Sequence, residues 1–180
     1  TNSNDCSGSV QLPTVTASDA CSSATVSATA ASAGDLVGNT IQNLPVGTHT
    51  VTYTATDDCG NEAEGTLTIT VEDQIAPIAI CDEHTILGIG SDGNASINAL
   101  TFDDGSYDNC GIVEYLVRRM DDAACPGFDG TSFAESVPFY CCDVNTTVMV
   151  ELRVRDAAGN VNSCMVEVEV QDKINPTIIC

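Results

Sequence analysis

The chain has little positive charge and few large aromatic side chains. Its 180 residues include no tryptophan, four phenylalanines, four tyrosines and two histidines, and five lysines and arginines stand against 26 acidic residues. The formal net charge of −21 repels phosphate backbones and anionic membrane surfaces. We therefore expect neither nucleic acid nor an anionic membrane surface as a partner.

Two further absences narrow the class of protein. No apolar run approaches the roughly 20 residues that a membrane-spanning helix needs, so no membrane span is expected. The first residues lack the basic and apolar regions of a signal peptide, so we expect any targeting segment to be removed or to lie outside this sequence. His49 and His84 accompany no recognisable nucleophile motif, which argues against an enzyme.

Cysteine is abundant. Ten cysteines occur without a C-x-x-C pair and with only two histidines, a pattern that indicates disulfides and not zinc or redox sites. Disulfides persist outside the reducing cytosol. The sequence therefore predicts an extracellular or cell-surface protein.

Alternation of apolar and polar residues dominates the chain. The segments 48–56, 65–73, 147–156 and 164–172 all have a period of two, with many β-branched residues, which is typical of strands. The breaks between them are clusters of Gly, Asn, Asp and Pro. We predict an all-β protein with antiparallel sheets.

The sequence contains an internal repeat. VEDQIAPIAIC (71–81) returns as VQDKINPTIIC (170–180), and the D-x-x-G-N motif at 57–61 returns at 156–160, both after 99 residues. Cys21, at the end of SDAC, corresponds to Cys110, at the end of YDNC. Between this cysteine and the D-x-x-G-N motif the second copy has about ten extra residues, which we place within 118–142. The repeat predicts a first module at 1–74, a second at 75–172 and a connector at 173–180 that joins the next unit.

The repeated residues resemble the hyalin-repeat (HYR) modules of extracellular proteins. The resemblance rests on LPVGTHTVTYTATDDCGNEAEGTLTITVED in the first copy, and on DNCG and VELRVRDAAGNVNSCMVEVEVQD in the second. It implies two tandem immunoglobulin-like β-sandwiches, of the kind that large bacterial cell-surface proteins carry in tandem. The resemblance also implies a disulfide between Cys81 and Cys164.

The other cysteines leave alternatives open. Cys141 and Cys142 are adjacent in an apparent strand, so they should face opposite ways and take different partners. Cys110 and Cys125 are available to them, and six cysteines permit 15 connectivities. In the first copy we assign Cys6 to Cys21.

The first copy is incomplete at its start. If the spacing from Cys81 to Cys110 applied there, its opening cysteine would fall before Thr1, so the first sandwich is predicted to lack its own first strand. Either the chain is cut from a longer tandem protein, or neighbouring subunits exchange a strand. In both cases we expect the connector of a preceding unit to complete the first copy, with Cys59 bonded to the incoming Cys180.

Acidic residues are expected to gather at one end of each sandwich, because the entering connector, one loop and the last hairpin turn meet there. Carboxylate and amide oxygens suit Ca²⁺, which takes six to eight oxygen ligands. The alternative is that these side chains only stabilise their turns. The predicted ligands are Asp73, Asp103, Asp104, Asp108, Asp156 and Asn160 for the second copy, and Asp19, Asp57, Asp58 and Asn61, with Asp172 of a preceding unit, for the first.

These features together predict a structural subunit or repeat segment of an extracellular fibre, stalk or adhesin. Its neighbours would be further copies joined head to tail. The alternative is a module that binds a surface glycan or protein through the loop at 118–142, although a disulfide-pinned elaboration also explains that loop.

Overall fold

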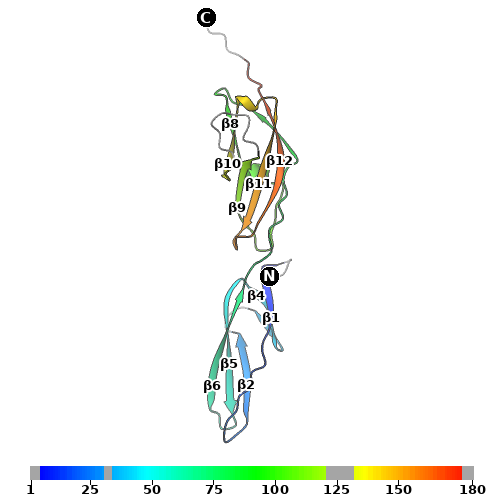
Figure 1. Ribbon diagram of the computed structural model, residues 1–180. Helices are drawn as coiled ribbons and strands as arrows, with labels where there is room; N and C mark the ends of the chain where they lie inside the picture. The colour runs from blue at the N-terminus through cyan, green and yellow to red at the C-terminus, as the bar shows by residue number, and fades with distance from the viewer. Residues whose placement is uncertain (1–4, 31–33, 121–131, 176–180) are drawn as a thin grey trace. The chain divides into compact units, whose positions relative to one another are not determined.

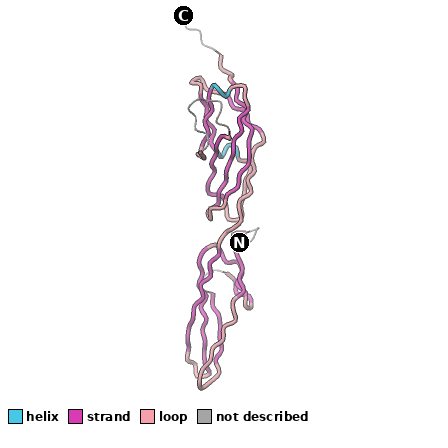
Figure 2. The backbone as a smooth tube through the Cα atoms, viewed as in Figure 1, coloured by secondary structure: helices cyan, strands magenta, loops and turns pink. Residues whose placement is uncertain are grey.

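The computed structural model describes residues 5–30, 34–120 and 132–175. The chain divides into two units, Thr1–Ile75 and Ala76–Cys180, and Figure 1 shows that both are built from strands. The described helices are two short 3₁₀ turns, η1 (Ala99–Phe102) and η2 (Cys141–Asp143), and Figure 2 places both in the second unit. None of the described helices has the length and apolar character needed to cross a bilayer. The predicted all-β class is confirmed.

The first unit consists of two three-stranded antiparallel sheets, ordered β1-β4-β3 and β2-β5-β6. Its core is small: among the described residues of the unit, the buried apolar ones are Leu12, Ile41, Leu44 and Val51. The strands are β1 (Ser7–Gln11), β2 (Ala24–Ala30), β3 (Asp35–Val37), β4 (Thr40–Pro45), β5 (Gly47–Asp57) and β6 (Glu62–Val71).

The second unit has a four-stranded sheet, ordered β7-β12-β11-β9, and a two-stranded sheet, β8-β10. Strand β7 pairs parallel with β12, and the other pairs are antiparallel. The strands are β7 (His84–Gly88), β8 (Asn94–Asn98), β9 (Ile112–Arg119), β10 (Ser136–Tyr140), β11 (Thr147–Asp156) and β12 (Val161–Gln171).

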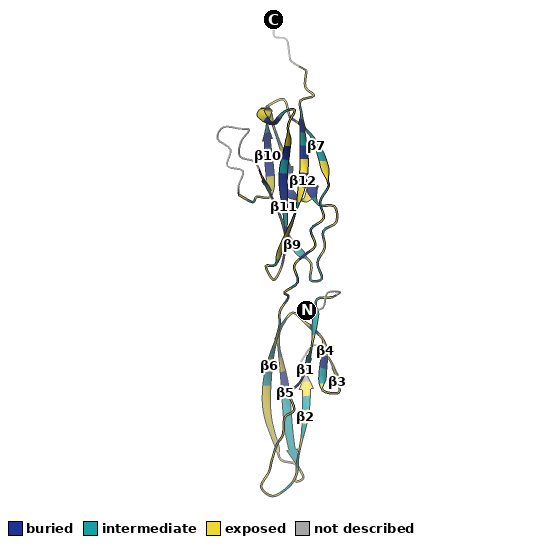
Figure 3. Cartoon of the chain, turned by 45° about the vertical axis from the view of Figure 1, so that its right-hand side comes forward, coloured by how far each residue is buried: buried dark blue, intermediate teal, exposed yellow. Residues whose placement is uncertain are grey.

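The core of the second unit is filled by alternate residues of β11 and β12, as the period of two requires. These residues pack with Phe102 and Phe139, which are fully buried. In Figure 3, β11 is mostly dark blue, whereas β6 of the first unit is teal and yellow. The fully buried valines and leucine of the two strands are Val148, Val150, Leu152, Val154, Val166, Val168 and Val170.

The two units share most of their topology, although β3 has no counterpart among the described residues of the second unit. Sheet β2-β5-β6 corresponds to β9-β11-β12, and the pair β1-β4 corresponds to β8-β10. Strand β7, which covers the edge of β12, has no counterpart among the described residues of the first unit. The predicted pair of Ig-like sandwiches is confirmed, and the described part of the first unit has no strand in the place of β7.

The D-x-x-G-N motif forms the same hairpin turn in both units. The N–H of Asp57 donates to Asn61 O at 3.0 Å, and that of Asp156 donates to Asn160 O at 3.1 Å. The glycine of each turn is left-handed, with φ of 85° at Gly60 and 95° at Gly159, a conformation that side chains with a Cβ disfavour. The motif therefore fixes where each long hairpin reverses.

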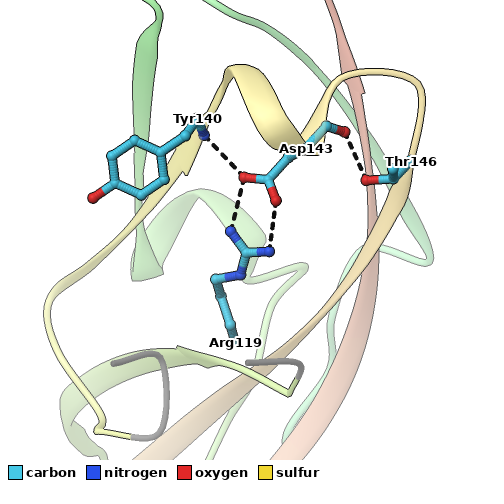
Figure 4. Close-up of polar contacts among 4 residues, drawn as sticks. All are labelled: Arg119, Tyr140, Asp143 and Thr146. Carbon is cyan, nitrogen blue, oxygen red and sulfur yellow. Dashed lines mark hydrogen bonds and ion pairs between the residues drawn. The ribbon is translucent and has the colours of Figure 1, made fainter. Parts of the chain in front are cut away.

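A buried ion pair fixes the end of the 118–142 segment (Figure 4). Arg119 Nη1 and Nη2 donate to the two carboxylate oxygens of Asp143 at 2.8 Å each, and Tyr140 N–H donates to Asp143 Oδ2 at 2.9 Å. Burial alone would raise the pKa of Asp143, but the hydrogen bonds from Arg119 and Tyr140 outweigh burial and hold that pKa below its ordinary value. Both charged side chains are buried, so each needs the other.

Candidate functional site

The acidic loop and turn of the second unit lie at one end of that unit. Residues 78 and 81 of the entering segment form antiparallel bridges to Tyr107 and Asp103, and Asp156 is paired with Ile112 at the start of β9. Loop 103–111 and the turn at 156–160 therefore lie close together in space. This brings together the segments that carry Asp103, Asp104, Asp108, Asp156 and Asn160.

Most of these side chains hold their own turns. Asp156 accepts hydrogen bonds from the N–H groups of Gly159 (2.7 Å) and Asn160 (2.8 Å) and from Asn160 Nδ2 (2.8 Å). Asp103 accepts from Ser106 N–H at 3.0 Å. These contacts are what the turn-stabilising alternative requires.

Asp108 differs from the other carboxylates. Its Oδ2 accepts from Cys110 N–H at 2.7 Å, whereas its Oδ1 is buried and has no hydrogen-bond partner among the described residues. A buried carboxylate oxygen without a partner is costly. Among the second-unit acids, this atom is the clearest position for a cation ligand.

The connector acids form matching turns. In the first unit, Asp73 is buried and its Oδ1 accepts from Ile75 N–H at 3.2 Å. In the second unit, Asp172 Oδ1 accepts from Ile174 N–H at 2.9 Å. Each unit therefore ends in the same D-x-I turn, which shows why the acid recurs in the repeated connector.

The first-unit acids surround one small depression. Asp19, Asp57, Asn61 and Glu62 contribute to its lining, and its volume is about 180 Å³. Asn61 lowers the pKa of Asp57 by hydrogen bonding, and the backbone N–H of Cys21 does so for Asp19. Both carboxyls therefore stay ionised to lower pH than usual. Asp58 lies beside them and accepts from Ser23 N–H at 3.1 Å.

The same face continues as a shallow groove along β6. A depression of about 200 Å³ lies between residues 15–17 and 63–65, and a further one of about 470 Å³ lies between β1 and the end of β6. Sequence reasoning predicted the absent strand but not this groove. The alternation in β6 matches that in β12, so periodicity could not show that one edge is covered and the other open.

One predicted disulfide is present and another is wrong. Cys81 and Cys164 are bonded, with Cα atoms 5.9 Å apart. Cys6 is disulfide-bonded but Cys21 is a free thiol, so the Cys6–Cys21 assignment fails. Cys6 precedes Ser7, which pairs with Pro45, whereas Cys21 lies near Asp58 at the far end of β5. Ten residues of strand separate these ends by about 30 Å, and bonded cysteines need Cα atoms within about 7 Å.

The cysteines of the 118–142 segment also differ from expectation. Cys141 and Cys142 belong to the 3₁₀ turn η2 and not to a strand. Cys110 and Cys142 each take part in a disulfide, but Cys141 is an exposed thiol, so the prediction that Cys141 is bonded is wrong. Cys125 and Cys180 lie outside the described residues. Cys59 is an exposed thiol, and its bond to an incoming Cys180 stays a prediction.

The histidines make structural contacts. His49 Nε2 lies 2.7 Å from Pro45 O, and His84 Nε2 lies 3.6 Å from Glu169 Oε2. A histidine held by a backbone carbonyl or a surface carboxylate is not arranged as the base of a nucleophile. These contacts give no positive support for enzyme activity.

Comparisons with known proteins identify the first unit. Comparison with curated protein sequences gives no match. Among solved structures, the chain is similar to human mucin-like protocadherin EC1-2 (TM-score 0.39, 13% identity, covering 82% of this chain and 84% of that one). It is also similar to the fibronectin(III)-like modules of Clostridium thermocellum CbhA (TM-score 0.35, 14% identity, 81% and 76%). Residues 2–71 match the HYR domain. The predicted resemblance of the first copy to HYR modules is therefore confirmed.

Proposed function

We propose that the chain is a structural unit of an extracellular fibre, stalk or adhesin, joined head to tail to further copies. The observation that carries this proposal is the repeated connector. The D-x-I turn that ends the first unit at Asp73–Ile75 recurs at Asp172–Ile174, followed by the same Pro and Cys pattern. Residues 71–81 lead from the first unit into the second, and the repeat of this segment at 170–180 supports a similar junction with the next copy.

The second unit is suited to carry tension. The Cys81–Cys164 bond joins the entering segment to β12, the last strand, and spans 83 residues of sequence. Force applied between the two connectors would pass through this bond and leave most of the unit unloaded. Parallel pairing of β7 with β12 adds a ladder whose hydrogen bonds are loaded together when the strands are pulled apart lengthwise.

Imaging tests the head-to-tail proposal. We expect the oxidised chain to form linear assemblies under electron microscopy and to elute above monomer size in light scattering. Non-reducing peptide mapping of the same material tests the predicted Cys59–Cys180 bond between copies. A chain that stays monomeric at high concentration would contradict the assembly role.

Calcium binding at the acidic end of the second unit is a separate proposal. The ligands would be oxygens of Asp103, Asp104, Asp108, Asp156 and Asn160, and the buried Asp108 Oδ1 supports a cation there. Extracellular modules of this kind bind Ca²⁺ with a Kd of about 10⁻⁴ to 10⁻³ M. Titration calorimetry should show binding that Asp108→Asn abolishes and that the control Asp92→Asn, in another turn of the unit, retains. Absence of binding heat at millimolar calcium would contradict a calcium site in this unit.

The rival function is recognition of a glycan or protein through the 118–142 segment. The described parts of this segment are anchored, because the guanidinium carbons of Arg118 and Arg153 lie 4.7 and 4.1 Å from the centroid of the Phe133 ring. A rigid base could present a binding loop or simply pin an elaboration. Replacing residues 121–131 by a Gly-Ser linker should leave assembly unchanged. Loss of a glycan-array or pull-down signal in that variant would favour the rival.

A further inference from the structure

Strand β6 of the first unit has an edge that corresponds to a covered edge in the second unit. Strand β12 pairs with β11 on one side and β7 on the other, whereas β6, within the described residues, pairs with β5 alone. Leu67, Ile69 and Val71 of β6 are only partly buried, although they align with the fully buried Val166, Val168 and Val170. The first unit therefore exposes apolar surface that the second unit covers.

The segment that starts this cover in the second unit is residues 76–81. Its backbone bridges to loop residues Asp103 and Tyr107, and Asn162 Nδ2 donates to Pro77 O at 2.9 Å. Ala79 and Cys81 pack against the core. The segment thus lies between loop 103–107 and the first half of β12.

The first unit has an empty groove at the corresponding place. The repeat aligns β12 with β6 at 99 residues and loop 103–107 with 14–18 at 89 residues. The two adjoining depressions of about 180 and 200 Å³ are lined by residues 15–19 on one side and 61–65 on the other. We define these two depressions as the acceptor groove.

We propose that the acceptor groove binds residues 175–180 of a second copy of this chain. The proposal rests on the head-to-tail function above and names its contact surface. The occupant is identified by its sequence, because Asn-Pro-Thr-Ile-Ile-Cys at 175–180 aligns with Ala-Pro-Ile-Ala-Ile-Cys at 76–81. In this alignment Pro176, Ile178 and Cys180 take the inward positions that Pro77, Ala79 and Cys81 hold in the second unit.

The sizes of the aligned residues support this occupant. The groove is walled by Ala55 and Ala63, where the second unit has the larger Val154 and Asn162. The incoming segment compensates, because Ile178 stands where the second unit has Ala79. In the first unit small wall residues would face a large incoming side chain, whereas in the second unit larger wall residues face the small Ala79. The total packed volume is therefore similar in the two units.

Charge also favours the connector as occupant. The first unit contains no lysine or arginine, and Asp19, Asp57 and Glu62 line the end of the groove. The connector supplies Lys173, two residues before Asn175. Opposite charges at the rim of an interface favour encounter and register.

Disulfide trapping tests the register directly. In the second unit Cys81 bonds Cys164, and position 164 aligns with Gly65, whose missing Cβ would meet no atom within 4 Å. This register is an alternative to the predicted Cys59–Cys180 bond, because Cys59 lies in the turn before β6 and not beside position 65. We therefore expect full-length Gly65→Cys, made with Cys59→Ser to remove that competing thiol, to form a ladder of disulfide-linked oligomers on mild oxidation by oxidised glutathione. Peptide mapping should join position 65 to Cys180.

Matched variants make the test decisive. Thr66→Cys in the same Cys59→Ser chain places the thiol on the outer face of β6 and should give less than about a tenth of the ladder, since neighbouring strand residues face opposite ways. Adding Cys180→Ser to the Gly65→Cys chain should abolish the ladder. Equal ladders from positions 65 and 66, or a position 65–Cys180 link within single chains, would overturn the proposal. If linear assemblies form without the link, the groove is wrong but the fibre function stands; if neither appears, both fail.

Discussion

The two units of this chain carry the same strand pattern but bury very different amounts of apolar side chain. In the second unit the alternate residues of β12 are fully buried, whereas those of β6 are only partly buried. The amino-acid types are similar, and burial of such a side chain contributes about 1.5–3 kcal/mol. The difference follows from one neighbouring strand, because β7 covers β12 and no described strand covers β6. Alternating apolar residues in one strand are therefore not enough to form a buried core, because neighbouring segments must also cover them.

The units also differ in how they neutralise charge. The first has no lysine or arginine, so its carboxylates rely on backbone N–H groups and amides. The second places Arg118, Arg119, Arg153 and Arg155 on β9 and β11, with Arg118 Nη2 2.6 Å from Glu151 and Arg155 Nε 3.0 Å from Glu114. We infer that the second unit is stable by itself and that the first gains stability from a partner.

The largest expected effect comes from removing the Cys81–Cys164 disulfide of the second unit. Replacing both Cys81 and Cys164 by alanine should lower that unit's free energy of unfolding by about 4–5 kcal/mol, because the bond closes a long loop in the unfolded chain. Calorimetry should show one transition shifted down by about 20 °C and the other unchanged. The control Cys141→Ala removes an exposed thiol and should shift neither transition. Equal shifts of both transitions would contradict the separation of the units.

The buried ion pair should give the next largest effect. Asp143→Asn leaves Arg119 buried without a counter-charge, which costs about 3–5 kcal/mol. Urea unfolding followed by circular dichroism should show the loss in the second unit alone. The exposed Asp92→Asn should cost less than about 1 kcal/mol. A similar small loss for Asp143→Asn would mean that the pair is solvated.

The same pair predicts a dependence on pH. The pKa of Asp143 is lower in the folded protein than its ordinary 3.8, so the stabilisation is present above that value and is lost as the pH falls through the folded pKa. The stability difference between the parent chain and Asp143→Asn should therefore shrink with acidification below about pH 4. A constant difference down to pH 2 would exclude ionisation of Asp143 as its source.

The two equivalent turns should give a smaller contrast. Asp156 is 1% exposed and accepts three hydrogen bonds, so Asp156→Ala should cost about 1–3 kcal/mol through unsatisfied N–H groups. Asp57 makes matching contacts in a solvated turn, where water can replace the lost carboxylate, so Asp57→Ala should cost less than about 1 kcal/mol. Parallel denaturant titrations compare them, and a larger loss for Asp57→Ala would reverse the expected order.

Much of the fold was predictable from the sequence because its signals are local. Alternation predicted the long strands, and Asp-x-x-Gly-Asn located both hairpin turns. The repeat also predicted the missing strand. The pairing of Cys6 was not predictable, because nearness in sequence to Cys21 does not show that β5 separates the two cysteines. The 3₁₀ turn at Cys141 was missed because its contacts with Arg119 and Gly93 are long-range.

The acidic site was predictable only in outline. The loop and the turn of the second unit meet at one end, as the sequence predicted, whereas their role as a calcium site stays a prediction. Sequence reasoning could not separate Asp156, whose oxygens serve its own turn, from Asp108, which keeps a buried oxygen without a partner among the described residues. That distinction depends on side-chain direction and burial, which the residue types alone do not specify.

Hydrogen exchange at two matched amides tests the central claim, an open β6 edge, most directly. In the second unit, Glu167 N–H donates to Glu83 O, just before β7, and Thr68 is the aligned residue of β6. In the monomeric chain we expect the Thr68 amide to exchange at least about tenfold faster than that of Glu167, since an uncovered edge opens easily. Equal protection of the two amides in the monomer would contradict an open edge.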